Sequence, residues 1–243
     1  MTSNDITKNV NETFKANDYD FVLFSQDPVI FTIIDHKLHV LMVKRSYEPY
    51  TGFWGLPGGR VDKHCENLQL ALAEKLKSKA GLEGVYFEQV YTEGGREMDP
   101  RGWSVTTIYM ALVNHSSIKF KENETGEDVD WQAVDSLDDL GPLAFWHRKL
   151  IDTTVTRLRD KLRYMDMAKH LMSKQFTIKE LRETYEIILG RELSRQAFDK
   201  RVRKAGILKE VGLSEKVSHR PAAIFEYRDL TDTHVYSAEL KLD

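Results

Sequence analysis

The first half of the chain alternates apolar runs with polar turns in a way typical of β-strands. Residues 21–35 and 37–45 are rich in β-branched and aromatic side chains, and the polar turn Asp35-His36-Lys37 joins them, so we expect a hairpin. Two similar runs follow at residues 85–93 and 105–113, and an acidic loop with a short strand at its end closes this half.

A segment with helical periodicity lies between the hairpin and the later strands. Leucines recur every four positions between residues 67 and 80, the spacing that places apolar side chains on one face of a helix. Gly81 follows, as expected for a helix that ends in a left-handed residue. A Gly/Pro-rich loop, residues 48–59, leads into the segment. The first half therefore predicts an α/β domain.

The second half changes to helical periodicity from Pro142 onward. We expect a long amphipathic helix over residues 142–164, because proline is favoured at the first helical position. No Gly/Ser-rich linker follows it, so we expect the two halves of the chain to be mechanically coupled. Three shorter helical units and two short strands around a polar turn complete the pattern, at residues 165–174, 177–189, 194–205, 207–212 and 222–228.

The composition is that of a folded protein of two domains. The chain has 243 residues, of which 41% are apolar and 30% charged, and this length exceeds that of one typical domain. The polar N-terminus lacks the features of a signal peptide, and no apolar run approaches the roughly 20 residues that span a bilayer. Cys65 is the single cysteine, which excludes an intramolecular disulfide and fits a reducing compartment. We expect a cytoplasmic protein without membrane association.

The charge is divided unevenly along the chain. Residues 1–147 carry 14 Lys and Arg against 23 Asp and Glu, a balance of −9, whereas residues 148–228 carry 20 against 11, a balance of +9. The last fifteen residues add −3, so the formal net charge of −3 conceals a basic segment. Such a segment has the electrostatic footprint of a protein that binds a polyanion. Solvated helix faces with a chance surplus of basic residues are the alternative.

The order of hairpin, glycine loop and helix resembles the Nudix hydrolase family. The residues that carry the resemblance are the run from Gly52 to Gly59 (GFWGLPGG), Glu66, and the Gly81-Leu82 pair. The family motif is G-x5-E-x7-R-E-U-x-E-E-x-G-U, where U is apolar. Its glutamates lie on one face of a helix, where they can hold Mg²⁺ against a pyrophosphate while the metal activates water.

This chain departs from the motif at the positions that bind metal. With Gly81 as the anchor, Glu74 stands at the arginine position, Lys75 at the next glutamate, and Ser78 and Lys79 at the two later glutamates. Two lysines would repel a divalent cation, so we expect no catalytic residues, no metal and no hydrolysis. Two alternatives stay open: metal-assisted hydrolysis through Glu66 and Glu74 alone, and an unrelated α/β domain.

Loss of metal ligands leaves ligand binding possible. Gly58 and Gly59 have no Cβ and can approach a diphosphate closely. Arginines at strand ends or in loops can pair with phosphates, and aromatic rings can stack on an adenine. The run from Lys44 to Gly59, followed by DPRGW at residues 99–103, resembles the ADP-ribose pyrophosphatase branch, which implies a site for ADP-ribose or a related dinucleotide. The candidate ligand residues are Arg45, Glu48, Tyr50, Trp54, Gly58, Gly59, Arg60, Arg101 and Trp103. Trp54 fits a core position as well, and Asp99 offers Arg101 a partner in its own loop.

The basic segment has the form of a helix-turn-helix followed by a wing. Thr177 and Ser194 are N-cap residues that open two short helices, and Gly190 ends the first. The second helix presents a polar and basic face that suits the major groove, although a solvated helix explains the same residues. The candidate DNA contacts are Thr177, Ser194, Arg195, Gln196, Lys200, Arg203 and Lys204 on the helices, with His219 and Arg220 in the wing.

Together the two halves resemble the Nudix-related transcriptional regulators of NAD metabolism, the NrtR type. The resemblance implies a Nudix α/β/α sandwich with a mixed sheet, followed by a C-terminal winged helix. It also implies a homodimeric repressor of NAD biosynthesis or salvage genes that binds double-stranded DNA at a palindromic operator and is released by ADP-ribose. We expect a flexible arm at 1–17, a sensing domain at 18–150, a connecting helix at 151–164, a DNA-binding domain at 165–230 and a tail at 231–243. An active ADP-ribose or nucleoside-diphosphate pyrophosphatase and an RNA-directed Nudix protein are the alternatives.

Overall fold

A computed structural model describes residues 22–61, 64–117, 128–214 and 221–228. The predicted arm, the C-terminal tail and the wing residues His219 and Arg220 lie outside the described residues. Within the described part, no helix is long and apolar enough to cross a membrane. The sheet strands are β1 (Leu23–Ile34), β2 (Lys37–Lys44), β3 (Trp54–Gly55), β4 (Gly59–Arg60), β5 (Tyr86–Gly95), β6 (Ser104–Leu112) and β7 (Asp128–Ala133), and helix α2 (Leu68–Ala80) separates β4 from β5.

The N-terminal half is built on one mixed sheet. Its strands run in the order β3-β2-β1-β6-β5, with β4 paired to β1 and β7 to β2. β1 and β6 pair in parallel and the other pairings are antiparallel. The expected hairpin is β1–β2, and its turn places Asp35 and His36 at φ 46° and 59°, the left-handed geometry that a tight hairpin turn requires.

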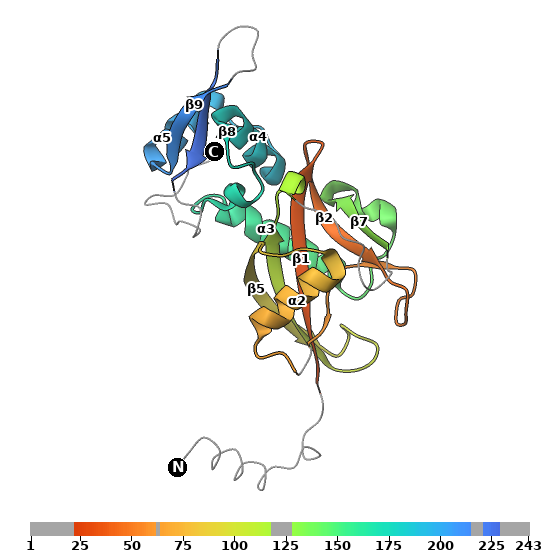
Figure 1. Ribbon diagram of the computed structural model, residues 1–243. Coiled ribbons are helices and arrows are strands. Elements are labelled where there is room, and N and C mark those ends of the chain that lie inside the picture. The colour runs from red at the N-terminus through yellow and green to blue at the C-terminus, as the bar shows by residue number, and fades with distance from the viewer. Residues whose placement is uncertain (1–21, 62–63, 118–127, 215–220, 229–243) are drawn as a thin grey trace, which may run out of the picture.

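The sheet is covered on both faces, as Figure 1 shows, and this confirms the predicted α/β/α sandwich. Successive residues of a strand point to opposite faces. Accordingly, Ile30 of β1 packs with Leu72 and Leu76 of α2 in one hydrophobic cluster. Its neighbours Val29 and Phe31 belong to a second cluster on the face that α3 (His147–Lys161) covers.

The long helix begins five residues later than Pro142, so the sequence-based start was wrong. Phe145 has a φ of 52°, a left-handed conformation that a helix cannot include. The preceding amide of Ala144 donates to the carbonyl of Trp54 at 2.8 Å. This tertiary hydrogen bond ties residues 142–146 to β3, so that the helix starts only at His147.

The C-terminal part has the expected helix pair and a small sheet. Thr177 caps the first helix in a complete capping box with Glu180, and Ser194 caps the second. The helical unit predicted at 165–174 was wrong in extent: this segment contains only a short 3₁₀ helix, in which Met167 and Ala168 are fully buried, and Lys169 forms an ion pair with Asp166. The elements of this part are β8 (Phe176–Thr177), α4 (Ile178–Leu189), α5 (Arg195–Ala205), β9 (Leu208–Leu213) and β10 (Ala223–Tyr227). Its three strands lie in the order β8-β10-β9. Short 3₁₀ helices lie at His115–Ser117, Val134–Leu140 and Met167–His170.

One hydrophobic cluster runs through both halves of the molecule. It includes Phe31 of the large sheet, Leu158 of α3 and Phe198 of α5. An ion pair and a ring contact reinforce the junction: Lys161 of α3 pairs with Glu88 of β5, and the ring of Tyr86 in β5 stacks on that of His170. The continuous core supports the expectation that the two halves move as coupled bodies.

Candidate ligand cavity and DNA-recognition helix

A cavity of about 470 Å³ opens between the glycine loop, the start of β1, helix α2 and the first turn of α3. β4 pairs with β1 at Ser25 and Gln26, which lays the glycine loop across the beginning of that strand. Basic side chains from four segments line the cavity, whose polar lining residues include Ser25, Asp27, Arg45, Arg60, Glu74, Lys75, Ser78, Lys79, Asp99, Arg101, Thr106 and His147.

Gly58 lies against the floor of the cavity. A Cβ at this position would stand 1.8 Å from Oδ1 of Asp27 and 2.7 Å from the carbonyl oxygen of Gln26. Asp27 is buried, and its Oδ2 accepts a hydrogen bond from the hydroxyl of Thr106 at 2.6 Å. Only glycine permits this approach of the loop to β1, so Gly58 is explained by packing as well as by ligand access.

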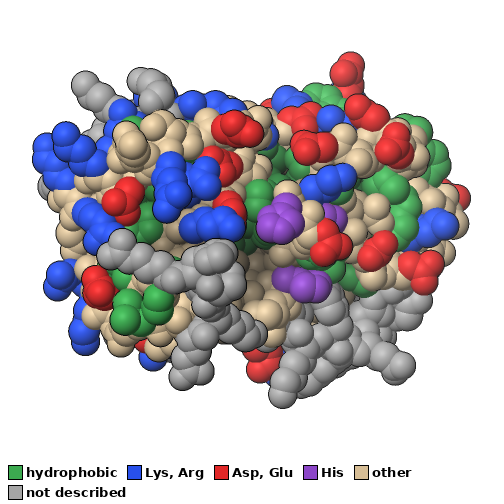
Figure 2. Space-filling view, turned by 90° about the horizontal axis from the view of Figure 1, so that it is seen from above, with side chains coloured by type: hydrophobic (Ala, Val, Ile, Leu, Met, Phe, Trp, Pro, Cys, Tyr) green, Lys and Arg blue, Asp and Glu red, His purple; other side chains and the backbone are tan. Residues whose placement is uncertain are grey.

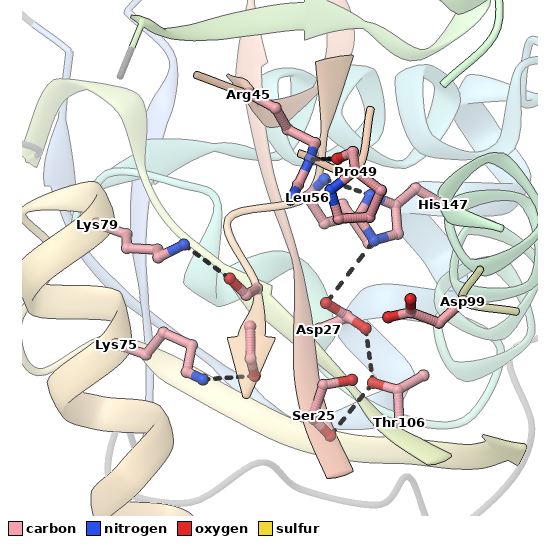
Figure 3. A network of polar contacts seen from close by, with 12 residues as sticks. Ser25, Asp27, Arg45, Pro49, Leu56, Lys75, Lys79, Asp99, Thr106 and His147 are labelled. Atoms are coloured by element: carbon pink, nitrogen blue, oxygen red, sulfur yellow. Dashed lines mark hydrogen bonds and ion pairs between the residues drawn. The ribbon is translucent and has the colours of Figure 1, made fainter. Parts of the chain in front are cut away.

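His147 joins the loop, the sheet and α3 at one point (Figure 3). The amide of Leu56 donates to its Nδ1 at 2.8 Å, so Nδ1 has no proton, and Nε2 stands 3.8 Å from Oδ1 of Asp27. Burial lowers the pKa of His147, against the opposing effect of Asp27. The imidazole is therefore neutral at pH 7, with its proton on Nε2 facing the carboxylate.

Two lysines of α2 bind the glycine loop. Lys75 Nζ donates to the carbonyls of Gly59 at 2.6 Å and Arg60 at 2.8 Å, and Lys79 Nζ donates to that of Gly58 at 2.9 Å. Figure 3 shows both side chains reaching from α2 toward the loop. These two lysines thus hold the glycine loop against α2.

The two loop arginines of the cavity are held by groups of their own segments. Arg101 makes a bidentate pair with Asp99, at 2.9 Å to Oδ1 and 2.6 Å to Oδ2. Burial raises the pKa of Asp99, but the bonds from Arg101 outweigh it and hold that pKa below its ordinary value. Arg45 donates to the carbonyl of Pro49 at 2.8 Å and lies over the rings of Tyr47 and Phe145.

The cavity contains only part of the predicted ligand set. Arg45, Gly58, Gly59, Arg60 and Arg101 line it. The remaining candidates lie outside the lining, and their role as ligand contacts stays a prediction: Glu48 and Tyr50 in the loop after β2, Trp54 in β3 packed on the core, and Trp103, 44% exposed, before β6.

Sequence reasoning missed the residues that only the fold brings to the cavity. Asp27 and Thr106 belong to strands that are buried over most of their length, and His147 was expected inside a helix. No local signal marks them, because their partners lie far away in the sequence. Lys75 and Lys79 were noted in the sequence only as an expected loss of metal ligands, and that reasoning did not predict their hydrogen bonds to the loop.

The cavity does not fit a divalent metal ion of the kind that Nudix hydrolases use. Mg²⁺ prefers carboxylate and water oxygens, but α2 turns two ammonium groups toward the loop and lines the cavity with one carboxylate, that of Glu74. That carboxylate already accepts a bond from Cys65 Sγ at 3.1 Å. Across the described ranges, no three His, Cys, Asp or Glu side chains stand close enough together to hold a metal.

Helix α5 presents the polar face that the sequence predicted. Phe198 and Val202 are buried beneath it, with the ring of Phe198 set edge-on to Tyr185 of α4. In Figure 2 the Lys and Arg side chains predominate over the winged helix, whereas Asp and Glu predominate over the sheet domain. The exposed candidates on this part are Ser194, Arg195, Gln196, Lys200, Arg203 and Lys204. Arg203 also donates to Asp199 at 3.1 Å, and the hydroxyl of Thr177 is engaged by Glu180.

Family models match both halves of the chain. One described as the NUDIX domain matches residues 25–154, and one described as the NrtR DNA-binding winged helix domain matches residues 168–227. A curated relative named ADPR responsive transcriptional repressor NtrR, from Acinetobacter baylyi, is 35% identical over 215 residues, 88% of this chain and 85% of the relative. An ADP-ribose pyrophosphatase from Methanocaldococcus jannaschii is 28% identical over 120 residues, 49% of this chain and 67% of that enzyme.

Solved structures of the same type superpose on both halves. Shewanella oneidensis NrtR complexed with a 27mer DNA matches with a TM-score of 0.75 at 34% identity, covering 84% of this chain and 93% of that one. The NUDIX domain of the same protein complexed with ADP ribose matches at 36% identity with a TM-score of 0.56, covering 65% of this chain and 99% of that one. With its mixed sheet and its winged helix, the chain belongs to the NrtR family, in which a Nudix domain is joined to a DNA-binding winged helix.

Proposed function

We propose that this protein is an ADP-ribose-responsive repressor of NAD biosynthesis or salvage genes. In this proposal it binds a palindromic operator as a homodimer through its winged helices and takes up ADP-ribose in the cavity of the Nudix domain. The names and ligands of its relatives support the assignment. The cavity, with its lysines, arginines and glycine loop, suits an anionic diphosphate.

The position of α3 carries the proposal. His147, its first residue, lines the ligand cavity. Near its other end, Arg159 Nε donates to the carbonyl of Ile188 at 2.8 Å, in the last turn of α4. A single helix therefore contacts both the ligand cavity and the DNA-binding domain, which makes it the candidate element of communication.

Regulation requires that ADP-ribose bind two arrangements of the domains with different affinity. ADP-ribose can lower DNA affinity only if it binds the arrangement of domains that is found off DNA better than the arrangement found on DNA. A typical coupling free energy is about 1–3 kcal/mol, which is a change of about 5- to 150-fold in affinity. Because His147 holds the glycine loop through Leu56, a loop that shifts around a diphosphate acts directly on the first turn of α3.

The test is a titration on DNA. The full chain is bound to a fragment from upstream of its own gene, and ADP-ribose, NAD and AMP are added while DNA binding is followed by fluorescence anisotropy. We expect ADP-ribose to release the DNA, and sedimentation to show a dimer on half-sites separated by about 10 bp or a multiple of it. Unchanged DNA affinity at saturating ADP-ribose would refute the regulatory role.

Substitutions in the proposed recognition helix, α5, provide a second test of DNA binding. Replacing Arg195 and Gln196 by alanine should cost about 1–3 kcal/mol for each base contact and weaken operator binding more than binding to unrelated DNA. Lys77 of α2 is the matched control, since its ammonium is exposed and paired with Glu83 in the sheet domain. An equal loss of operator affinity in the α5 variants and in the Lys77 control would exclude α5 as the helix that recognises the operator sequence.

We infer further that the Nudix domain does not hydrolyse its ligand. The support is the side chains that α2 turns toward the glycine loop: Lys75 and Lys79 stand there, on the side of the helix where carboxylates would have to hold Mg²⁺. A Mg²⁺-dependent release of AMP and ribose 5-phosphate from ADP-ribose would contradict this inference and favour the pyrophosphatase alternative. The assay needs the purified full chain, with EDTA as its control.

A further inference from the structure

Two ammonium groups stand together beside the glycine turn. A Cβ built on Gly59 would lie 3.8 Å from Nζ of Lys75 and also 3.8 Å from Nζ of Lys79. The two charges therefore flank one point, and glycine leaves that point open. Both side chains line the ligand cavity.

Three carbonyl oxygens of the loop converge on these ammonium groups. They belong to Gly58, Gly59 and Arg60, at 2.6–2.9 Å from the two Nζ atoms. Carbonyl oxygens are also the ligands that hard divalent cations take. The loop thus directs toward α2 the kind of donors that suit a metal, and two side-chain cations receive them.

The remaining partly buried cations of the cavity are engaged elsewhere. Arg101 is neutralised by Asp99 in a bidentate pair, and Arg45 donates to the carbonyls of Pro49 and Tyr47. Lys75 and Lys79 are the two ammonium groups that face the glycine turn from α2, and the exposed Arg60 adds a further positive charge to the cavity lining. Each ammonium group attracts an anion, and a multivalent anion at the point between them can interact with both.

We propose that Lys75 and Lys79 take the place of the divalent metal of a Nudix site and hold the diphosphate of the ligand directly. Binding is then independent of Mg²⁺ and selects diphosphates over monophosphates. This inference rests on the proposed function, because it assumes that ADP-ribose occupies the cavity. It also explains how a site can retain a nucleotide without metal: an ammonium group neutralises phosphate charge but supplies no activated water.

The first experiment compares ligands and metal by calorimetry on the full chain. ADP-ribose, ADP and AMP are titrated in buffer with EDTA and in buffer with Mg²⁺. We expect equal affinity in the two buffers, and tighter binding of ADP-ribose and ADP than of AMP. Binding of ADP-ribose that appears only with Mg²⁺ would overturn the inference.

The second experiment removes the charges. Lys75→Met and Lys79→Met should each weaken ADP-ribose and ADP by about tenfold or more, the usual effect of losing a hydrogen bond to a charged group, with a smaller effect on AMP. Lys77→Met on the same helix is the matched control, since Lys77 pairs with Glu83, and we expect no change. Circular dichroism reports whether each variant is folded.

A purely structural role for the lysines is distinguished by a third pair of variants. Lys75→Gln retains an N–H donor for the loop carbonyls but has no charge, whereas Lys75→Arg retains the charge. We expect weak binding with a reduced salt dependence in the first, and binding near that of the parent chain in the second. Parental affinity in Lys75→Gln, Lys75→Met and Lys79→Met would overturn the inference and leave the proposed function intact. Failure of the parent chain to bind ADP-ribose in either buffer would instead refute the proposed function.

Discussion

Acid should loosen the junction between the sheet domain and the winged helix, and His170 gives the size of the effect. Its imidazole stacks on the ring of Tyr86 with centroids 4.0 Å apart and planes 14° from parallel. Burial, with help from the charge of Lys169, lowers the pKa of His170 to about 4. Protonation of His170 therefore works against the packing that joins β5 to the segment after α3.

Acid lowers the unfolding free energy because the unfolded chain binds the proton more readily than the folded chain. An unfolded histidine has a pKa of about 6.5, so as the pH falls below this value the unfolded chain gains a proton that the folded chain does not. The stability contributed by the neutral imidazole is complete above about pH 6.5 and is lost progressively toward about pH 4. Between about pH 7.5 and about pH 5.5 the expected loss is about 1.4 kcal/mol of unfolding free energy. His147, whose pKa burial also lowers, adds to the loss in the same direction.

The assay is urea unfolding followed by circular dichroism at the two pH values. His170→Phe retains a ring on Tyr86 and cannot titrate, so its unfolding free energy should fall by about 1.4 kcal/mol less than that of the parent chain. His115→Gln is the control, because His115 is exposed, and it should behave as the parent. The same pH dependence in His170→Phe as in the parent chain would refute the reasoning.

Three further substitutions test the fold around the two sites. Gly58→Ala should displace the glycine loop and abolish ADP-ribose binding in calorimetry, since its Cβ would stand 1.8 Å from Asp27. Gly212→Ala is the control: its Cβ would have nothing within 4 Å, so this change should be neutral or stabilise the protein by up to about 1 kcal/mol. Thr177→Ala removes the capping box of α4 and should cost about 1 kcal/mol in urea unfolding; an unchanged stability would contradict the cap. Phe198→Ala empties a core position that is 2% exposed and should cost about 3–5 kcal/mol together with operator binding in anisotropy; retained binding would contradict the packing of α5.

The winged helix was the most predictable part because its signals are local. Thr177 and Ser194 cap their helices through hydrogen bonds to amides three residues ahead, and Gly190 and Gly206 end them in left-handed conformations. Such interactions depend on neighbours in the chain, so periodicity and end signals are enough to locate them. The sheet domain was less predictable: the leucine spacing located α2 and apolar runs located β1, β2, β5 and β6, but the two-residue strands β3 and β4 form only through pairing with β2 and β1.

By itself, the amino-acid sequence determined the periodic helices, the longer apolar strands and the division of charge, since each is a property of short segments or of composition. The tertiary structure alone decided where α3 begins, because the bond from Ala144 to Trp54 and the left-handed Phe145 override the preference for proline at a helix start. It also decided that His147 joins the cavity to that helix, and that Lys75 and Lys79 bind the glycine loop. The partners in the contacts of His147 with Leu56 and of the two lysines with the loop lie 15 to 91 residues apart, a separation that only the packing of the sheet between its helices brings within hydrogen-bond distance.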